Sequence, residues 1–407
     1  MIKKHWLNLP LLLVVTSSLS LAALNYSVSQ ISPSAKYGRL PFTSGTAHLK
    51  RADQNLSSGL EKVDTEKLLS ISKASLRSDP LNPRALRNYS LHFRALDKTK
   101  KSFSFAKMAN KLSRRDVISN LLLIENMANT KTTDPGAILR HYDIILRTNP
   151  ETYTKLYPAL VQVMSTNQAQ EQFEYYFKRQ APWLADVMRN TLDNDNGPRG
   201  ITEILLHTYP GKTVVLPQAF DSNSLFEGLF KRGEYELMKE LFLRLKETEP
   251  KWLYSKDFGL SKTQRKYGPL AWSFNNSAEF GAYLVESNDQ VAPLVEVLAS
   301  SGSRGEVMKR ILFLNPGDYS VVSNFTVNDA NLNSEIRYSL YCLKDKMNIN
   351  FAHDNPIFDI DLLDQDTRTP IMFTLECKSQ IFKIDVVGGD SQVGMSVQMS
   401  VPNFEKK

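Results

Sequence analysis

Ser222–Pro250 reads SNSLFEGLFKRGEYELMKELFLRLKETEP and has the clearest structural pattern in the chain. Lys231–Tyr235 predicts a turn between two helices, because glycine is favoured just beyond the end of a helix. Further on, Leu237, Leu241 and Leu245 recur at four-residue spacing, which predicts one apolar face on the second helix. The stretch therefore predicts two antiparallel helices followed by a proline.

Similar turns recur along residues 60–250. Two helical patterns end at Asp79-Pro80 and Asn149-Pro150, and prolines follow at positions 150, 182, 217 and 250, at spacings of 32, 35 and 33 residues. On these residues the region resembles tetratricopeptide-repeat proteins, whose period is about 34 residues. The resemblance implies an α-solenoid, a stack of antiparallel helix pairs.

Two features depart from this repeat pattern. Bulky side chains stand where such repeats have small ones, so irregular packing is expected: Ile138, Ile145, Met238 and Leu245. Lys212–Leu216 is rich in β-branched residues, which favours a short strand or a buried extended loop over a helix.

Residues 251–403 change to a period of two, which is typical of strands with one buried face. Apolar and polar side chains alternate in Ile336–Cys342, Phe358–Leu362, Phe382–Val386 and Val393–Val401. Turns are expected at residues 315–318 and 388–390, whereas residues 278–312 are compatible with strands or with a helix. The expected fold class is α+β and multidomain, with a C-terminal antiparallel β-sandwich of the jelly-roll kind.

Leu312–Tyr319, with the sequence LFLNPGDY, resembles the start of the jelly rolls in bacterial carbohydrate-binding modules. Together, the repeats and the sandwich resemble bacterial envelope proteins that accompany polysaccharide assembly or export. The resemblance implies that residues 251–403 bind carbohydrate.

The first 28 residues have the composition of an export segment. Two lysines precede the apolar run Leu11–Leu24, and positive charges before such a run orient it in a membrane. Ser20-Leu21-Ala22 fits cleavage by a signal peptidase, whereas the weakly apolar stretch Leu7–Val28 is long enough to remain as an anchor. Residues 29–59 are expected to be a flexible tether. The rest of the chain is then either anchored in the inner membrane facing the periplasm, or periplasmic or secreted after cleavage.

The net charge of +7 is unevenly distributed. Residues 50–115 hold 16 basic and 6 acidic residues, whereas residues 116–407 hold 30 basic and 37 acidic ones. Arg84, Arg87 and Arg94 share one face of a predicted helix. Further cations follow: Lys98, Lys100, Lys101, Lys107, Lys111, Arg114 and Arg115. This basic face is either solvated or binds anionic lipid headgroups or an acidic polysaccharide, and nucleic acid is not an expected partner of an exported protein.

The chain has two cysteines, Cys342 and Cys377, and both lie on predicted inward faces. An even pair in one exported domain predicts a disulfide, which would close a 35-residue loop. Two reduced cysteines buried as small hydrophobic side chains are the alternative.

Sequence motifs for catalysis are incomplete. Gly211-Lys212-Thr213 lacks the glycine that a phosphate-binding loop needs five residues earlier, where Leu206 stands. Gly389-Asp390-Ser391 resembles part of a serine-hydrolase motif, but a hairpin turn explains it better. The six histidines have no metal-ligand spacing, and His92 and His141 are expected on helix surfaces. We therefore expect no catalytic residues and no cofactor.

Two further groups are candidates for ligand binding. Four carboxylates near a strand end either hold calcium or form a solvated face: Asp359, Asp361, Asp364 and Asp366. Four aromatic residues either stack on sugar rings or belong to the core of the sandwich: Trp272, Phe274, Tyr283 and Tyr319.

The sequence thus predicts a non-enzymatic, membrane-tethered scaffold or binding protein of the periplasm that acts in envelope or exopolysaccharide assembly or export. Its expected partners are the membrane, through the N-terminal segment, and an envelope polysaccharide, a protein or both. One alternative is a protein-interaction scaffold with a purely structural sandwich. Another is a carbohydrate-active hydrolase, which needs two carboxylates facing each other at about 5–9 Å.

Overall fold

The computed structural model describes residues 49, 65–129, 134–150, 153–164, 170–211, 213–285, 294–329, 333–344, 356–363, 370–390 and 394–407. The predicted export segment lies outside these residues, and so does the predicted tether apart from Leu49. Within the described ranges, no helix has the length and apolar character needed to cross a membrane. The chain divides into two compact units, Met1–Lys155 and Leu156–Lys407.

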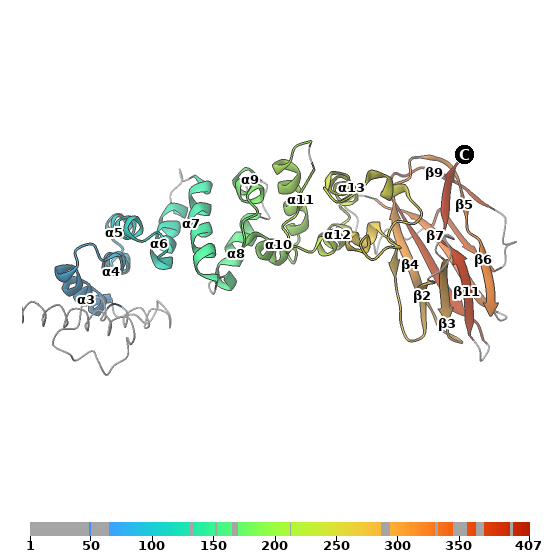
Figure 1. Ribbon diagram of the computed structural model, residues 1–407, viewed down its shortest axis with the longest axis horizontal. Helices are drawn as coiled ribbons and strands as arrows, with labels where there is room; N and C mark the ends of the chain where they lie inside the picture. Colours follow the sequence, from blue (N-terminus) through green and yellow to red (C-terminus); the bar gives the residue numbers. More distant parts are fainter. Residues whose placement is uncertain are drawn as a thin grey trace, which may run out of the picture. The chain divides into compact units, whose positions relative to one another are not determined.

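The first unit is helical (Figure 1). Its helices are α3 (Thr65–Ser78), α4 (Pro83–Ala95), α5 (Thr99–Leu112), α6 (Val117–Ala128) and α7 (Pro135–Thr148), and each packs against the next one along the chain. Asn82 and Asp134 cap α4 and α7 by accepting backbone N–H bonds. A proline follows each cap at the first helical position, where no amide donor is needed. The helix ends predicted at Asp79-Pro80 and Asn149-Pro150 are confirmed.

α8 (Tyr153–Met164) contains the boundary between the units, and the second unit continues with α9 (Gln170–Lys178), α10 (Leu184–Thr191), α11 (Gly197–Thr208), α12 (Ser222–Lys231) and α13 (Tyr235–Arg244). The predicted turn between α12 and α13 is confirmed. Gly233 has a φ of 72°, and its N–H donates to the carbonyl of Phe230. The predicted extended segment is also confirmed at Val214, which is buried and forms a parallel bridge with Leu245. Membership of these helices in a repeat family stays a prediction.

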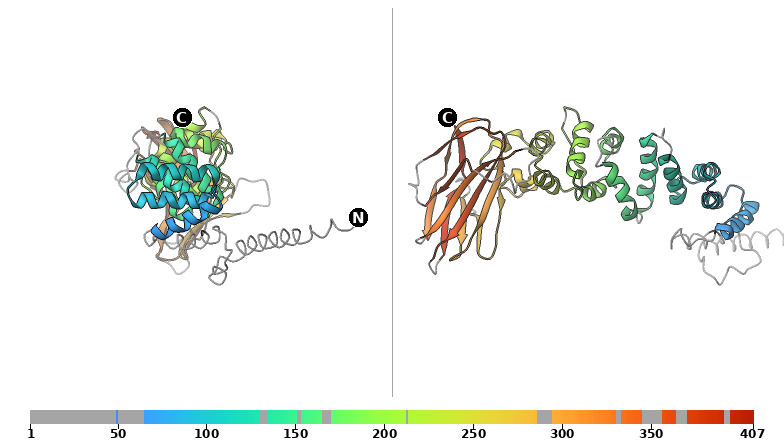
Figure 2. Two further views of the ribbon diagram at one scale, coloured as in Figure 1. Left: turned by 90° about the vertical axis from the view of Figure 1, so that its left-hand side faces the viewer. Right: turned by 180° about the vertical axis from the view of Figure 1, so that it is seen from behind.

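Three antiparallel sheets follow, with the orders β1-β4-β10-β7-β8, β2-β3-β11-β6 and β12-β5-β9 (Figures 1 and 2). The strands are β1 (Ser273–Phe274), β2 (Phe280–Val285), β3 (Leu294–Ala299), β4 (Arg304–Leu312), β5 (Gly317–Val322), β6 (Phe325–Asp329), β7 (Ser334–Cys342), β8 (Phe358–Asp361), β9 (Ile371–Leu375), β10 (Gln380–Gly388), β11 (Met395–Ser400) and β12 (Asn403–Lys406). Among residues 278–312, those that the structure describes include β2, β3 and β4 and no helix.

Side chains from all three sheets meet in one core, which includes Val297, Phe373 and Phe382. The short three-stranded sheet continues the four-stranded one, because β5 leads into β6 and β11 leads into β12. The pairs Phe325–Met399 and Val322–Asn403 lie on either side of the break. The alternation predicted for these strands is confirmed, since β11 and β10 bury every second side chain over most of their length. The outer face of the β2-β3-β11-β6 sheet carries polar side chains together with Tyr283 and Leu298, which are not buried in the core.

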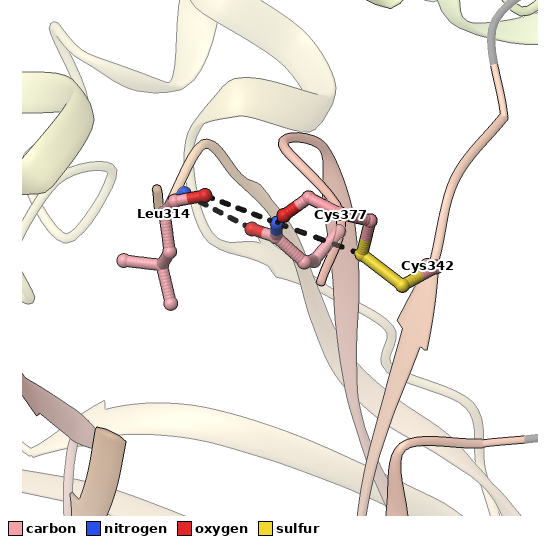
Figure 3. Close-up of a disulfide and its surroundings, with 4 residues drawn as sticks. Leu314, Cys342 and Cys377 are labelled. Atoms are coloured by element: carbon pink, nitrogen blue, oxygen red, sulfur yellow. Dashed lines mark hydrogen bonds between the residues drawn. A yellow bond between two sulfur atoms is a disulfide. The ribbon is translucent and has the colours of Figure 1, made fainter. Parts of the chain in front are cut away.

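The predicted disulfide joins Cys342 at the end of β7 to Cys377 just after β9 (Figure 3). Beside it lies the fully buried side chain of Gln380. Its amide nitrogen donates to the carbonyl oxygens of Cys377, at 2.6 Å, and of Leu314, at 3.2 Å. Its amide oxygen accepts the N–H of Leu314 at 3.0 Å. A buried amide is stabilising only when it is hydrogen-bonded, and these contacts fix the end of the sandwich where three connections meet.

Two short 3-10 helices, η4 (Pro250–Tyr254) and η5 (Arg265–Leu270), connect α13 to the first strand. The buried guanidinium of Arg310 in β4 holds them in place. It donates to the carbonyl oxygens of Leu270, at 3.0 Å, and Leu253, at 2.8 Å, and to two further carbonyls of the same segment. Its planar group also lies over the rings of Phe258 and Trp272. Burial lowers the pKa of Arg310 to about 9, so the group remains charged at neutral pH.

Candidate functional site

The four candidate aromatic residues occupy different environments. Trp272 is 2% exposed, and its indole N–H donates to the carbonyl of Lys256 at 2.7 Å. Tyr319 is buried and stacks on Phe373, with its hydroxyl donating to the main chain. Both therefore belong to the core, the alternative allowed by the sequence.

Phe274 is half-buried, with the guanidinium of Arg265 over its ring at 5.1 Å. Tyr283, in contrast, is 43% exposed on the outer face of the four-stranded sheet. Of these four aromatic residues, it is the one whose ring is most accessible to a ligand.

Tyr283 is the first of a row of side chains that crosses this sheet. It lies opposite Glu296 of β3, which lies opposite Gln398 of β11, which in turn lies opposite Thr326 of β6. Side chains in such cross-strand positions are neighbours, about 5 Å apart at their Cβ atoms. The row places one aromatic ring beside a carboxylate, an amide and a hydroxyl.

A second cross-strand row, formed by Gly281, Leu298, Ser396 and Asp329, adjoins the first. A shallow hollow of about 280 Å³ lies at this second row. Its walls include Tyr283, Leu298, Ser396 and Asp329. The hydroxyl of Ser396 lies 3.4 Å from Glu296 Oε1, so the two rows are linked by a hydrogen bond. The lining of the hollow thus combines apolar side chains such as Leu298 with hydrogen-bonding groups, as small-ligand sites commonly do.

A glycine sets the position of the Tyr283 ring. A Cβ atom at Gly281 would lie 3.1 Å from both Cε2 and Oη of Tyr283, and 2.8 Å from Oδ1 of Asn276. The ring therefore lies against the bare backbone of Gly281, on the surface of the sheet. Tyr283 is 43% exposed, so part of its ring remains accessible to a ligand.

The hollow is acidic. Its described lining includes Glu279 and Asp329 and no lysine or arginine, and Glu296 adjoins it. An anionic ligand would be repelled at this surface, whereas an uncharged ligand with many hydroxyl groups would find carboxylate acceptors, which form the stronger hydrogen bonds.

Glu296, Ser396, Gln398 and Asp329 are not among the binding residues that the sequence predicts. The alternation of apolar and polar residues in β11 predicts that its polar residues face outward, and this pattern is the signal for Ser396 and Gln398. Glu296 lies within residues 278–312, for which the sequence is compatible with strands or with a helix. The pairing of β2 with β3 and of β3 with β11, which brings the row together, has no local signature in the sequence.

The group of carboxylates that could hold calcium or form a solvated face is described only in part, because Asp364 and Asp366 lie outside the described residues. Asp359 accepts a hydrogen bond from Ser339 and pairs with Arg337, while Asp361 accepts the backbone N–H groups of Ile336 and Leu363. Both carboxylates therefore have protein partners. Among the residues that the structure describes, no group of three or more His, Cys, Asp or Glu side chains is arranged to hold a metal.

The expected basic face on α4 is not an exposed cationic surface. Arg87 is buried and pairs with Asp116 at 2.9 Å, and Arg94 pairs with Glu125 at 2.6 Å. Two of the three arginines are therefore neutralised, by Glu125 of α6 and by the N-terminal cap of α6, Asp116. Arg84 is half-buried. Lys98 and Lys101 are exposed as expected.

The two histidines expected on helix surfaces are less accessible than predicted. His92 is buried beneath Phe93 and lies 3.8 Å from the carboxylate of Glu66. His141 is half-buried and lies 2.7 Å from Oδ1 of Asn120, and burial lowers its pKa. Both helices pack against neighbours on the faces that carry these side chains.

No protein-family model matches the sequence, and no curated protein is similar to it. Solved structures with some similarity include the carbohydrate-binding module TmCBM61 in complex with beta-1,4-galactotriose, at 10% identity over 33% of this chain and 87% of that one, with a TM-score of 0.23. The enzymatically active domain of the bacteriophage CBA120 tailspike protein 4 is 10% identical over 34% of this chain and 19% of its own, also with a TM-score of 0.23.

The accessory secretory proteins 1, 2 and 3 of Streptococcus pneumoniae give 8% identity over 34% of this chain and 97% of theirs, again with a TM-score of 0.23. TM-scores at this level are too low to transfer a fold or a ligand to the chain. The site therefore rests on its own geometry.

Proposed function

We propose that this protein is a non-enzymatic binding protein whose sandwich domain holds an uncharged glycan on the outer face of the β2-β3-β11-β6 sheet. The observation that carries the proposal is the exposed ring of Tyr283, which lies close to the backbone of Gly281 beside a row of hydrogen-bonding side chains. Sugar rings have an apolar C–H face and a rim of hydroxyl groups, and this surface offers a partner for each.

The acidic character of the surface supports an uncharged ligand over an acidic one. Glu296 adjoins the Tyr283 ring, and Glu279 and Asp329 line the hollow. Carboxylates accept hydrogen bonds from sugar hydroxyls strongly, but they repel uronic acids and phosphorylated sugars. The proposal therefore commits to neutral glycans.

The proposed place of action is outside the cytoplasm, tethered to a membrane by the N-terminal segment, in envelope or exopolysaccharide assembly or export. The disulfide between Cys342 and Cys377 supports this location, because disulfides form and persist mainly in oxidising compartments. The sequence of the first 28 residues supports the tether.

Affinity electrophoresis of the full chain in detergent, through gels that contain neutral or acidic polysaccharides, tests the proposal. We expect at least one neutral polysaccharide to retard the wild-type chain and to be recovered without cleavage, as a non-enzymatic protein requires. The Tyr254→Ala control, which removes an exposed tyrosine outside the sheet, should be retarded as well. Tyr283→Ala should migrate without retardation. Retardation by acidic polysaccharides alone, or equal retardation of all three proteins, would overturn it.

A further inference from the structure

The exposed face of α5 in the first unit carries cations that are not neutralised. Lys100, Lys107 and Lys111 are spaced seven and four residues apart, so they form one stripe along the helix. α5 contains no acidic residue, and no carboxylate in the described part of the chain pairs with any of the three. Arg87 and Arg94 of α4 differ in this respect, because Asp116 and Glu125 are their partners.

An apolar stripe runs directly beside the lysines. Met108 is 41% exposed and Leu112 is 45% exposed, and their four-residue spacing makes them neighbours on the helix. Lys101, seven residues before Met108, lies on the same side of the helix as Met108 and Leu112. The opposite side of α5 is occupied, because Ser102, Ala106 and Ala109 are buried there against the rest of the unit. Both stripes therefore face away from the fold.

The combination of lysines and exposed apolar side chains distinguishes between an anionic lipid surface and an acidic polysaccharide. A polysaccharide would pair with the lysines and leave Met108 and Leu112 in water, whereas a lipid surface takes up both: phosphate groups next to the ammonium groups, and acyl chains around the apolar side chains. We propose that the exposed face of α5 binds the surface of a membrane that contains anionic lipids. This contact is separate from the proposed glycan site and does not depend on it.

Lysine acylation followed by mass spectrometry tests the contact on the full chain. The chain is incorporated into phosphatidylcholine vesicles, with and without phosphatidylglycerol. We expect anionic vesicles to slow labelling of Lys100, Lys107 and Lys111 about fivefold, with recovery at high salt. Exposed lysines of the second unit, Lys256 and Lys262, should label equally on both vesicles. Equal labelling of the three α5 lysines on both vesicles would overturn the proposal.

A variant that lacks the apolar stripe but keeps every charge separates lipid binding from general polyanion binding. Met108→Ser/Leu112→Ser removes the apolar stripe at exposed positions where the fold loses little packing. The lipid contact predicts that protection by anionic vesicles weakens in this variant. Unchanged protection, or stronger protection by a soluble acidic polysaccharide than by the vesicles, would contradict it.

Discussion

At the scale of single residues, Arg310 shows how a cation is accommodated inside this protein. Its guanidinium donates hydrogen bonds to the carbonyl oxygens of Trp252, Leu253, Ser255 and Leu270, and its flat group lies over two aromatic rings. Arginine suits this position because its donors are arranged in a rigid plane, which a lysine cannot reproduce. The bonds tie η4 and η5 to β4.

Arg310→Met is therefore expected to destabilise the second unit by about 3–5 kcal/mol, because it leaves several buried carbonyl groups without donors. Urea unfolding followed by tryptophan fluorescence measures the loss. Lys309→Met, at the next position in β4, removes a half-exposed ion pair with Glu306 and should cost less than about 1 kcal/mol. Similar losses for both variants would contradict the role given to Arg310.

Asp385, in contrast to Arg310, is a charged group whose ionised form is disfavoured by its surroundings in the fold. It lies between Glu306 of β4 and Arg337 of β7. Burial, and next the charge of Glu306, raise its pKa above the usual 3.8, although Lys383 and Arg337 oppose the shift. The ionised form of Asp385 is thus less stable in the folded chain than in the unfolded one.

Asp385→Asn should consequently raise the stability of the folded chain at pH 7. The gain should shrink as the pH falls through the raised pKa and vanish below about 3.8, where the aspartate is protonated in both states. Urea midpoints of both proteins between pH 4 and pH 8 measure this difference. A variant that is less stable than the wild type at pH 7 would contradict the account.

At the scale of elements, the outer face of β2 depends on the absence of one side chain. The missing Cβ of Gly281 leaves room for the ring of Tyr283, because such an atom would lie 3.1 Å from Cε2 and Oη of the ring. Gly281→Ala is expected to displace that ring and to weaken glycan binding about tenfold while far-UV circular dichroism stays unchanged, because ring contact is lost but the pairing of β2 with β3 is not. Gly302→Ala strains a turn, because Gly302 has a φ of 69°, but its added Cβ meets no atom within 4 Å, so this variant controls for backbone strain away from the Tyr283 ring. Binding that is unaffected by Gly281→Ala would show that the ring position is unimportant.

The elements also show how far sequence reasoning extends. The turn at Gly233, the alternation in β10 and β11 and the Cys342–Cys377 bond are confirmed, because each has a local cause or a single possible partner. The basic face of α4 was misjudged because Asp116 and Glu125 come from another helix. Likewise, the row from Tyr283 to Thr326 arises from strand pairing across distant segments, which the sequence does not encode locally.

At the scale of the whole molecule, the disulfide links the stability of the sandwich to its compartment. Cys342→Ser/Cys377→Ser should lower the free energy of unfolding by about 3–4 kcal/mol, the loop entropy of a 35-residue closure. Urea unfolding with and without dithiothreitol measures it: the reductant should destabilise the wild type and leave the double variant unchanged. Two free thiols in protein isolated from cells under non-reducing conditions would contradict both the bond and the proposed export.

The two proposed surfaces have opposite charge, and the sequence shows the same division. Basic residues are concentrated in residues 50–115, which include α5, whereas residues 116–407 are acidic overall and include the glycan face. A cationic surface suits anionic lipid, and an acidic one suits a neutral sugar. We propose that these surfaces serve one protein that stays at a membrane and binds glycan.

Isothermal titration of a neutral oligosaccharide into the full chain in detergent tests the central claim most directly. A sugar ring covering about 60 Å² of Tyr283 contributes about 1.5 kcal/mol, so Tyr283→Ala should raise the Kd about tenfold. Tyr283→Phe, which keeps the ring, and Tyr254→Ala, which removes a tyrosine that is 57% exposed elsewhere, should stay within about twofold of the wild type. An unchanged Kd for Tyr283→Ala, or an equal rise for Tyr254→Ala, would contradict the glycan site.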